Sequence, residues 1–264
     1  MPEAKALIVE RDKNVLIITI NRPHARNAVD STTAQALADA FELFERSEDL
    51  HVAVLTGAQG TFCAGADLRE IAQGSRAPVN PEGRAPMGPT WMQLRKPAIA
   101  AVEGYAVAGG LELALLCDLR VAAHDAVFGV FNRRWGVPLI DLGTVRLPRI
   151  VGQGVALDLI LTGRSVTGQE AAQIGLVNRL TEKGKALETA QELAHTIAAF
   201  PQLCLRADRM SAFEQWSLPW DQARRNEVRH GLTVLDSGES VKGAALFASG
   251  AGRHGSSAKD TSAD

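Results

Sequence analysis

Short apolar runs alternate with helical patterns through the first half of the chain, and this alternation constrains the fold more than any other feature. A helix is predicted over residues 31–46, STTAQALADAFELFER, with Asp30 or Ser31 as its N-cap. The runs that predict strands are VLIITIN (15–21), HVAVLTG (51–57), KPAIAAVEG (96–104) and LRVAA (119–123). Strands that alternate with helices are typical of an α/β fold.

Two further regions complete the predicted organisation. APVNPEGRAPMGP (77–89) holds four prolines and two glycines, which predicts a mobile loop without regular structure. From about residue 185 the pattern is helical, and a helical tail after an α/β core often serves packing or assembly. We therefore expect a core over residues 1–195 and a helical assembly region over residues 196–264, ending in a frayed polar tail.

Composition and charge exclude several classes of protein. The formal net charge of −2 gives no general field that would steer nucleic acid or an anionic membrane. The longest apolar runs are shorter than the roughly 20 residues that span a bilayer. Three separated cysteines and the absence of an apolar leader segment at the start predict free thiols and a cytoplasmic location.

Known spacing motifs exclude further chemistry. The sequence has no H-E-x-x-H, no paired C-x-x-C and no His–carboxylate cluster, so we expect no built-in metal site. VGQGVALD (151–158) lacks the third glycine of a dinucleotide fingerprint and is predicted to begin a helix.

Two glycine-rich turns remain, TGAQGTFCAGADLREI (56–71) and GYAVAGGLELALLCD (104–118). Each follows an apolar strand and opens toward a helix, where backbone N–H groups have no helical partner. Either turn alone is an ordinary strand-to-helix connection. Together they can aim two N–H groups at one oxygen, which predicts an oxyanion hole for a carbonyl that gains charge in a reaction.

These turns and their neighbours resemble the enoyl-CoA hydratase/isomerase superfamily, the crotonase fold. The matching segments are NRPHARNAV (21–29), TFCAGADL (61–68), IAAVEGYAVAGGLELALLCD (99–118), FGVFNRRWGV (128–137), GTVRLPRIVG (143–152) and LTGRSVTGQEAAQIGLVNRL (161–180). The resemblance implies a spiral of ββα turns, a C-terminal helical trimerisation region and assembly as a homotrimer or homohexamer.

The same resemblance implies roles for the residues of the two turns. Ala66 and Gly109 match the backbone donors that hold the thioester carbonyl, and Ala64 matches the position whose carbonyl meets the adenine of CoA. Asp67 and Leu68 complete the first turn and are expected to contact the CoA thioester.

The resemblance also implies CoA contacts outside the two turns, but there the sequence departs from the family pattern at two positions. Arg26 lies in the segment that meets the nucleotide end of CoA, although an ordinary surface arginine explains it nearly as well, and His24 stands where a lysine is common. Phe247, in LFAS (246–249), matches a phenylalanine that reaches a neighbouring subunit's CoA pocket. A lysine expected three residues later is Gly250, so Arg253 would have to supply that charge.

Acid–base residues carry the chemistry that the resemblance implies. Glu112 matches one of two acids that hydratases use to add water across an enoyl thioester, and its apolar neighbours should raise its pKa. The second acid position is Asn132, and an amide cannot give or take a proton at neutral pH. Either Glu112 acts alone, or Asp141 enters the pocket as the second acid, unless Asp141 is the N-cap of the next helix.

The sequence thus predicts an acyl-CoA enzyme that stabilises a thioester enolate, in the first place an enoyl-CoA hydratase. A double-bond isomerase with a single carboxylate and a catalytically weak CoA-thioester binder are the alternatives. No cofactor beyond the CoA of the substrate, no nucleic acid and no membrane insertion are expected.

Overall fold

The computed structural model describes residues 5–75 and 78–250. Within them the chain forms two compact units, the first ending at Ala198 and the second beginning at Ala199. The division lies close to the boundary predicted at residue 195.

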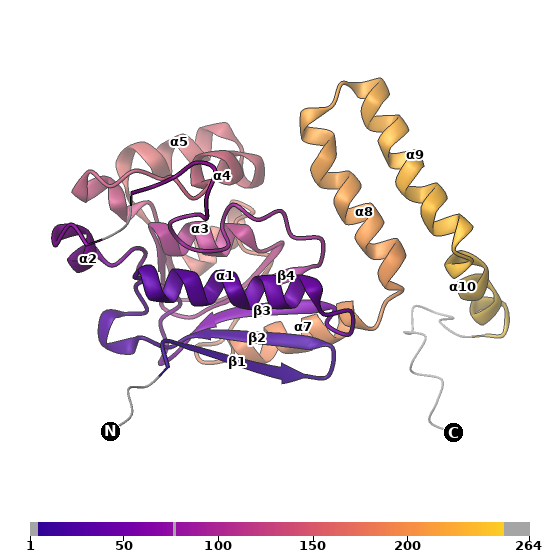
Figure 1. Cartoon of the computed structure of the whole chain (residues 1–264), viewed down its shortest axis with the longest axis horizontal. Coiled ribbons are helices and arrows are strands. Elements are labelled where there is room, and N and C mark those ends of the chain that lie inside the picture. Colours follow the sequence, from indigo (N-terminus) through magenta and orange to yellow (C-terminus); the bar gives the residue numbers. More distant parts are fainter. Residues whose placement is uncertain (1–4, 76–77, 251–264) are drawn as a thin grey trace. The chain divides into compact units, whose positions relative to one another are not determined.

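Nine strands form two sheets in the described part of the first unit. Figure 1 shows the first four of them, β1 to β4. The larger sheet has the order β1 (Leu7–Asp12), β2 (Val15–Ile20), β3 (Val52–Gly57), β4 (Ala98–Val102), β6 (Leu119–Ala123) and β9 (Arg179–Thr181). The smaller sheet has the order β5 (Tyr105–Val107), β7 (Val127–Gly129) and β8 (Ser165–Thr167). β1 and β2 pair antiparallel, and every later pair in the larger sheet is parallel.

The chain moves repeatedly between the two sheets. β4 and β6 belong to the larger sheet, whereas β5 and β7, which follow each of them, belong to the smaller one, and helices come next in each case. This is the predicted α/β architecture with a spiral of ββα turns.

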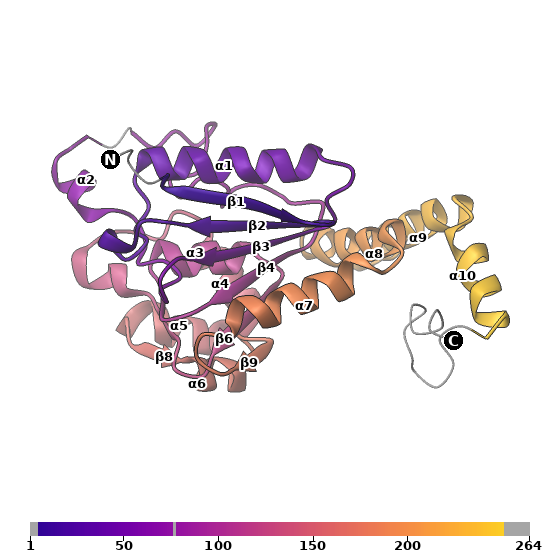
Figure 2. The ribbon, with the colours of Figure 1, turned by 90° about the horizontal axis from the view of Figure 1, so that it is seen from below.

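Helices cover both faces of the larger sheet. The helices of the first unit are η1 (Pro23–Ala25), α1 (Ser31–Arg46), α2 (Leu68–Ala72), α3 (Gly109–Leu116), η2 (Phe131–Trp135), α4 (Gly143–Val151), α5 (Gln153–Thr162), α6 (Gly168–Gln173) and α7 (Ala186–Ala198). α1 and α7 lie on opposite sides of strands β1 to β4 (Figure 2). Val15 and Ile17 pack toward α7, and Leu16 and Ile18 pack into the larger core with α1, so β2 is buried on both faces.

The second unit is a set of helices with few buried side chains. They are α8 (Gln202–Glu214), η3 (Gln215–Ser217), α9 (Trp220–Asp236) and α10 (Glu239–Ala248). Over residues 199–250 only Ala207 and Val234 are buried. Glu214 links α8 to α9 by accepting a hydrogen bond from Asn226 (2.7 Å) and pairing with His230 (2.8 Å).

Most predicted elements are confirmed, with one clear correction. The helix over 31–46 has the predicted bounds, and Asp30 is its N-cap, accepting from the Thr33 N–H. The strand predicted over 96–104 is confirmed as β4, but it ends two residues earlier than predicted, at Val102, and β5 begins at Tyr105. Gly104 makes the intervening turn at φ +53°, close to the Gly60 carbonyl.

Two further segments can be compared with the sequence, and the described residues were also searched for membrane-spanning helices and metal-binding groups. Residues 78–89 form no helix or strand, and α5 begins where VGQGVALD predicts a helix. No described helix is long and apolar enough to cross a bilayer, and no described group of His, Cys, Asp and Glu could hold a metal ion.

Candidate active site

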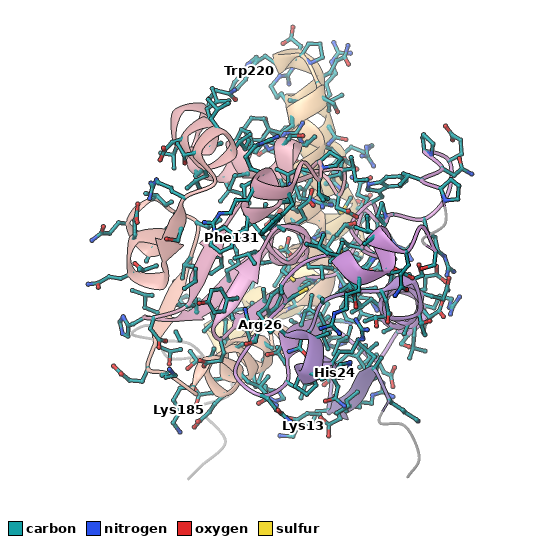
Figure 3. All side chains as sticks on the ribbon, turned by 90° about the vertical axis from the view of Figure 1, so that its left-hand side faces the viewer. Lys13, His24, Arg26, Phe131, Lys185 and Trp220 are labelled. Atoms are coloured by element: carbon teal, nitrogen blue, oxygen red, sulfur yellow. The ribbon has the colours of Figure 1, made fainter. Side chains whose placement is uncertain are left out.

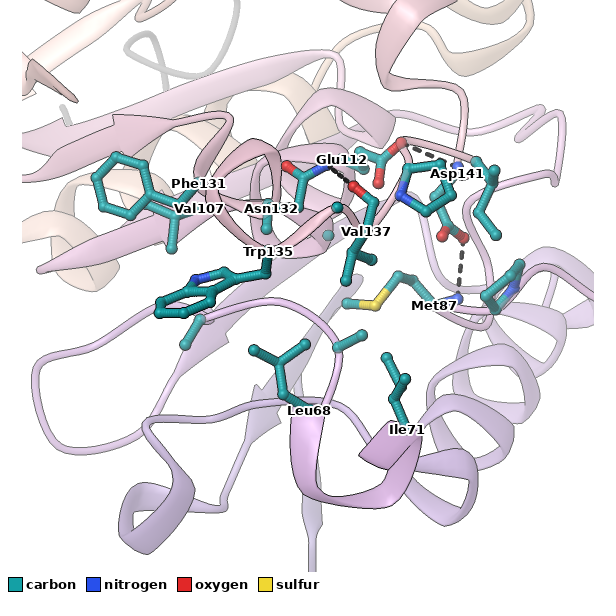
Figure 4. Close-up of a pocket in the computed structure, with 18 of the residues that line it drawn as sticks. Leu68, Ile71, Met87, Val107, Glu112, Phe131, Asn132, Trp135, Val137 and Asp141 are labelled. Carbon is teal, nitrogen blue, oxygen red and sulfur yellow. Dashed lines mark hydrogen bonds between the residues drawn. The ribbon is translucent and has the colours of Figure 1, made fainter. Parts of the chain in front are cut away.

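One cavity of about 1000 Å³ opens on the first unit and gathers most of the predicted site residues. Its wall comes from both glycine-rich turns, α2, the loop that contains Met87, η2 and residues 136–141. Apolar side chains such as Leu68, Ile71 and Val137 form much of this wall (Figure 4). The polar side chains that line it include those of Glu112, Asn132 and Asp141. An apolar cavity with a few convergent polar groups is typical of a small-molecule site.

The two glycine-rich turns lie side by side at this cavity. The Cys63 N–H donates to the Tyr105 carbonyl (2.8 Å), and the Val107 N–H donates to the Cys63 carbonyl (3.1 Å). Gly110 makes the contact closer still, because a Cβ there would overlap with the Cys63 carbonyl oxygen. The absence of a side chain at 110 therefore lets the two turns meet.

The amides of Ala66 and Gly109 belong to the wall of the cavity. In the described structure neither N–H donates to a protein acceptor. Gly109 is the first residue of α3, and the hydrogen bonds of the β-bridge between Val29 and Ala66 are made by the residues on either side of Ala66. Ala108, between β5 and α3, has φ +53° and ψ −125°, a conformation that a side chain disfavours by about 1–3 kcal/mol. The fold thus holds a strained turn directly before the Gly109 amide.

Glu112 lies in the first turn of α3, with only 2 % of its surface exposed. Its Oε1 accepts the N–H groups of Asp141 (2.9 Å) and Gly143 (2.8 Å), so the loop before α4 fixes the carboxyl group. A Cβ at residue 143 would lie 2.8 Å from that oxygen. Only glycine at this position leaves room for the Glu112 carboxyl group.

The surroundings of Glu112 favour its protonated form. Burial, followed by the negative charge of Asp141, raises the pKa of Glu112 to about 8, and the two N–H donors and Arg146 oppose this shift in part. The predicted direction of the pKa shift is therefore confirmed. A carboxyl group with such a pKa can exchange a proton near neutral pH.

Asp141 lies beside Glu112 and connects it to the loop that contains Met87. Its side chain is 3 % exposed, and Oδ1 accepts the Met87 N–H (2.9 Å) and the Thr90 hydroxyl. The interpretation of Asp141 as a helix N-cap is wrong: α4 begins at Gly143 and its N-cap, Leu142, makes no side-chain cap. The Asp141 carboxylate instead binds the loop that contains Met87 and Thr90.

Asn132 is buried in η2 and also lines the cavity. Its amide nitrogen donates to the Val137 carbonyl (2.7 Å), as Figure 4 shows, which fixes the turn after η2. Its Oδ1 is buried without a hydrogen-bond partner in the described part of the chain. The side chain therefore stands beside the acids as a neutral group.

Comparisons with known proteins decide the family. A family model described as enoyl-CoA hydratase/isomerase matches residues 10–248. The chain belongs to the enoyl-CoA hydratase/isomerase family. It is 36 % identical over 248 residues to enoyl-CoA hydratase EchA19 from Mycobacterium tuberculosis, covering 91 % of this chain and 92 % of the relative.

Other relatives within the enoyl-CoA hydratase/isomerase family agree. The 2,3-dehydroadipyl-CoA hydratase of Escherichia coli is 39 % identical over 233 residues, which cover 88 % of this chain and 91 % of that protein. A crystal structure of enoyl-CoA hydratase from Mycobacterium tuberculosis H37Rv superposes with a TM-score of 0.87 at 40 % identity, covering 92 % of this chain and 96 % of the other.

The CoA-binding residues predicted from this family fall into two groups. Ala64, Leu68 and Arg26, which is labelled in Figure 3, line the cavity, and the Ala64 N–H donates to the Arg26 carbonyl (3.1 Å). Asp67 is not part of the cavity wall. Its carboxylate caps α2 through the Arg69 N–H (3.0 Å) and pairs with Arg22 (3.1 Å).

Phe247 lies on α10 in the second unit, with 63 % of its surface exposed. Gly250 follows this helix, and Arg253 lies outside the described residues. The predicted contact of Phe247 with a neighbouring subunit therefore stays a prediction.

Several site residues escaped the sequence analysis. Met87, Thr90 and Arg146 are distant in sequence from Glu112, and no motif marks them. Thr90 directly follows the proline-rich segment of residues 77–89, and its burial, which would indicate a paired hydroxyl, is seen only in the structure.

Proposed function

We propose that the chain adds water across the double bond of a 2-enoyl-CoA thioester and forms the 3-hydroxyacyl thioester. The observation that carries the proposal is the buried carboxyl group of Glu112 in the same cavity as the unpaired amides of Ala66 and Gly109. The hydratase names of the relatives at 36–39 % identity support it.

In this proposal the two amides bind the thioester carbonyl oxygen. When the oxygen of water bonds to C3, electron density moves through the double bond to that carbonyl oxygen and forms an enolate. The Ala66 and Gly109 N–H groups stabilise the charge, and the positive end of the α3 dipole adds to this effect.

Glu112 supplies the proton transfer. The carboxyl group gives its proton to C2 of the enolate, and it regains a proton from the water that has bonded to C3. Neither atoms nor protons are left over, and no cofactor beyond the CoA of the substrate takes part. Asn132 cannot share this role, because a neutral amide does not transfer protons at these pH values.

A double-bond isomerase is the second candidate, and Asn132 at the position of the second acid is the observation that favours it. One carboxylate can remove a proton from C2 and return it to C4 while the same amides hold the enolate. A catalytically weak binder of CoA thioesters is the third candidate, since the amides would hold the thioester without any proton transfer.

The proposal includes CoA recognition by Arg26, Ala64 and Leu68. Asp67 does not contact CoA in this proposal; it stabilises the first glycine-rich turn through its ion pair with Arg22. The proposal also includes assembly as a homotrimer or homohexamer, which is supported by the exposed apolar side chains of the second unit. Those more than half exposed are Trp216, Trp220, Leu235, Val241, Leu246 and Phe247. A reducing compartment such as the cytoplasm suits the three cysteines, none of which forms a disulfide.

The decisive experiment measures two reactions with the same preparation. We expect loss of the conjugated enoyl absorbance of crotonyl-CoA as it is hydrated, and little conversion of a 3-enoyl-CoA. Faster isomerisation would favour the second candidate. Failure of both reactions, together with no deuterium exchange at C2 of a bound acyl-CoA, would leave the binder.

A further inference from the structure

The cavity is lined by a second buried acid, Asp141, whose contacts differ from those of Glu112. Both carboxyl groups line the cavity, yet the Asp141 carboxylate accepts hydrogen bonds from the loop of residues 87–90. Its backbone N–H donates to Oε1 of Glu112 (2.9 Å). One residue thus joins the loop and the acid.

The loop contact extends to the predicted oxyanion turn. Met87 is almost fully buried, and a Cβ at Gly109 would lie 2.7 Å from its sulfur, so the Met87 side chain packs against Gly109. Asp141 holds the Met87 backbone through its N–H (2.9 Å). The position of Met87 over Gly109 therefore depends on the Asp141 carboxylate.

The negative charge of Asp141 acts on Glu112. Donors such as the Met87 N–H and the Thr90 hydroxyl favour the ionised form of a carboxyl group. The charged groups that act on Glu112 are Asp141 from the loop and Arg146 from α4, with opposite signs. Asp141 is the one that disfavours a negative charge on Glu112.

We propose that Asp141 is a positioning residue and that Glu112 is the only acid–base group of the site. Asp141 seats Met87 against Gly109, supplies one of the two N–H groups that hold Glu112, and adds its negative charge to the effect of burial, which together favour the protonated form of Glu112. The expected effect of Asp141 on turnover rests on the proposed function, whereas its expected effect on the titration of Glu112 does not.

The test compares Asp141→Asn with Thr90→Val. Asparagine keeps the shape of residue 141 and can still accept the loop donors, but it removes the negative charge. Valine at 90 removes the hydroxyl donor and leaves the charge of Asp141 in place. Glu112→Gln identifies the infrared band of the Glu112 carboxyl group, so that its titration can be followed without substrate.

In the wild-type protein the Glu112 band should titrate near pH 8. Asp141→Asn should lower this titration part of the way toward 4.5, the ordinary value of a glutamate, because burial, the larger cause of the raised pKa, remains; Thr90→Val should leave the titration unchanged. Turnover in Asp141→Asn should persist with its pH dependence moved in the same direction. Loss of a general acid–base residue typically lowers the rate by about 10²–10⁴-fold, which is more than we expect here.

Two results would overturn the assignment. One is a Glu112 titration that stays in place in Asp141→Asn. The other is loss of hydration at every pH in an Asp141→Asn protein that folds and binds the CoA thioester, since that result makes Asp141 the second acid. If the wild-type protein shows no hydration at all, the proposed function fails, whereas the infrared titration still tests Asp141.

Discussion

At the scale of single residues, Glu112 combines burial with a polar setting that favours its neutral form. The raised pKa has a consequence for stability. Between about pH 4.5 and 8, unfolding lets Glu112 release a proton that the folded protein retains. This group therefore destabilises the fold increasingly as pH rises, by up to about 1.4 kcal/mol per pH unit, and has no such effect below its unfolded pKa.

Glu112→Gln should remove this contribution and abolish turnover while leaving CoA-thioester binding nearly intact. We expect the difference in unfolding free energy, variant minus wild type, to increase from pH 5 to pH 8 in denaturant titrations. A difference that stays constant over this range, or a variant with full activity, would contradict the role assigned to Glu112.

Residues of the candidate site could be predicted unequally. Glu112 stands out because an acid inside an apolar run has few structural explanations. Asp141 was a candidate, but its contacts with Met87 and Thr90 join segments about 50 residues apart, which no local pattern encodes. The loop that carries both partners was expected only as irregular chain.

At the scale of elements, the two glycine-rich turns behave as one structure. Gly110→Ala should push the Cys63 carbonyl away and separate the Ala66 amide from the Gly109 amide. Since loss of one oxyanion donor typically lowers kcat by about 10²–10³-fold, we expect a loss of that order in hydration assays, with a lower Tm.

Gly154→Ala is the matched control, because a Cβ on this α5 residue meets no atom within 4 Å. Alanine there should keep full activity and stabilise the helix by about 0.5–1 kcal/mol. A folded Gly110→Ala protein with normal turnover would show that the contact of the two turns does not matter for the reaction.

Elements with strong patterns were predictable from the sequence, and short ones were not. β2, β3 and β6 are buried on both faces, so their apolar runs identify them within one residue. β1 was missed because its short apolar run, Leu7–Val9, is followed directly by three charged residues, and four of its six residues are exposed. β5, β7, β8 and β9 have only three residues each, and their pairing partners, distant in sequence, stabilise them.

At the scale of the whole molecule, the second unit lacks a core of its own. Two buried residues in about 50 cannot offset the conformational entropy of ordering three helices. The proposed assembly would cover its apolar side chains with other copies of the chain, so sedimentation should show a trimer or hexamer at micromolar concentration.

Variants that place charge on this surface test the same point. Trp220→Glu, at a residue 84 % exposed in the single chain, should weaken assembly if copies of the chain cover it. Lys13→Glu on the exposed β1–β2 turn is the control and should leave sedimentation unchanged. A stable monomer that binds CoA at full strength would contradict the expected assembly.

The contact between Gly110 and the Cys63 carbonyl also limits which substitutions this chain can accept during evolution. Because any side chain at 110 meets backbone rather than a movable side chain, no compensating substitution elsewhere can relieve the overlap. Glycine at 143 is constrained differently: a Cβ there would meet the Glu112 side chain, and displacing that carboxyl group would disturb the proposed acid–base residue. Descendants of this chain can acquire new substrates through substitutions in α2 and at Pro78 and Val79, which line the cavity, but the two glycines must be inherited unchanged for as long as this chemistry is under selection.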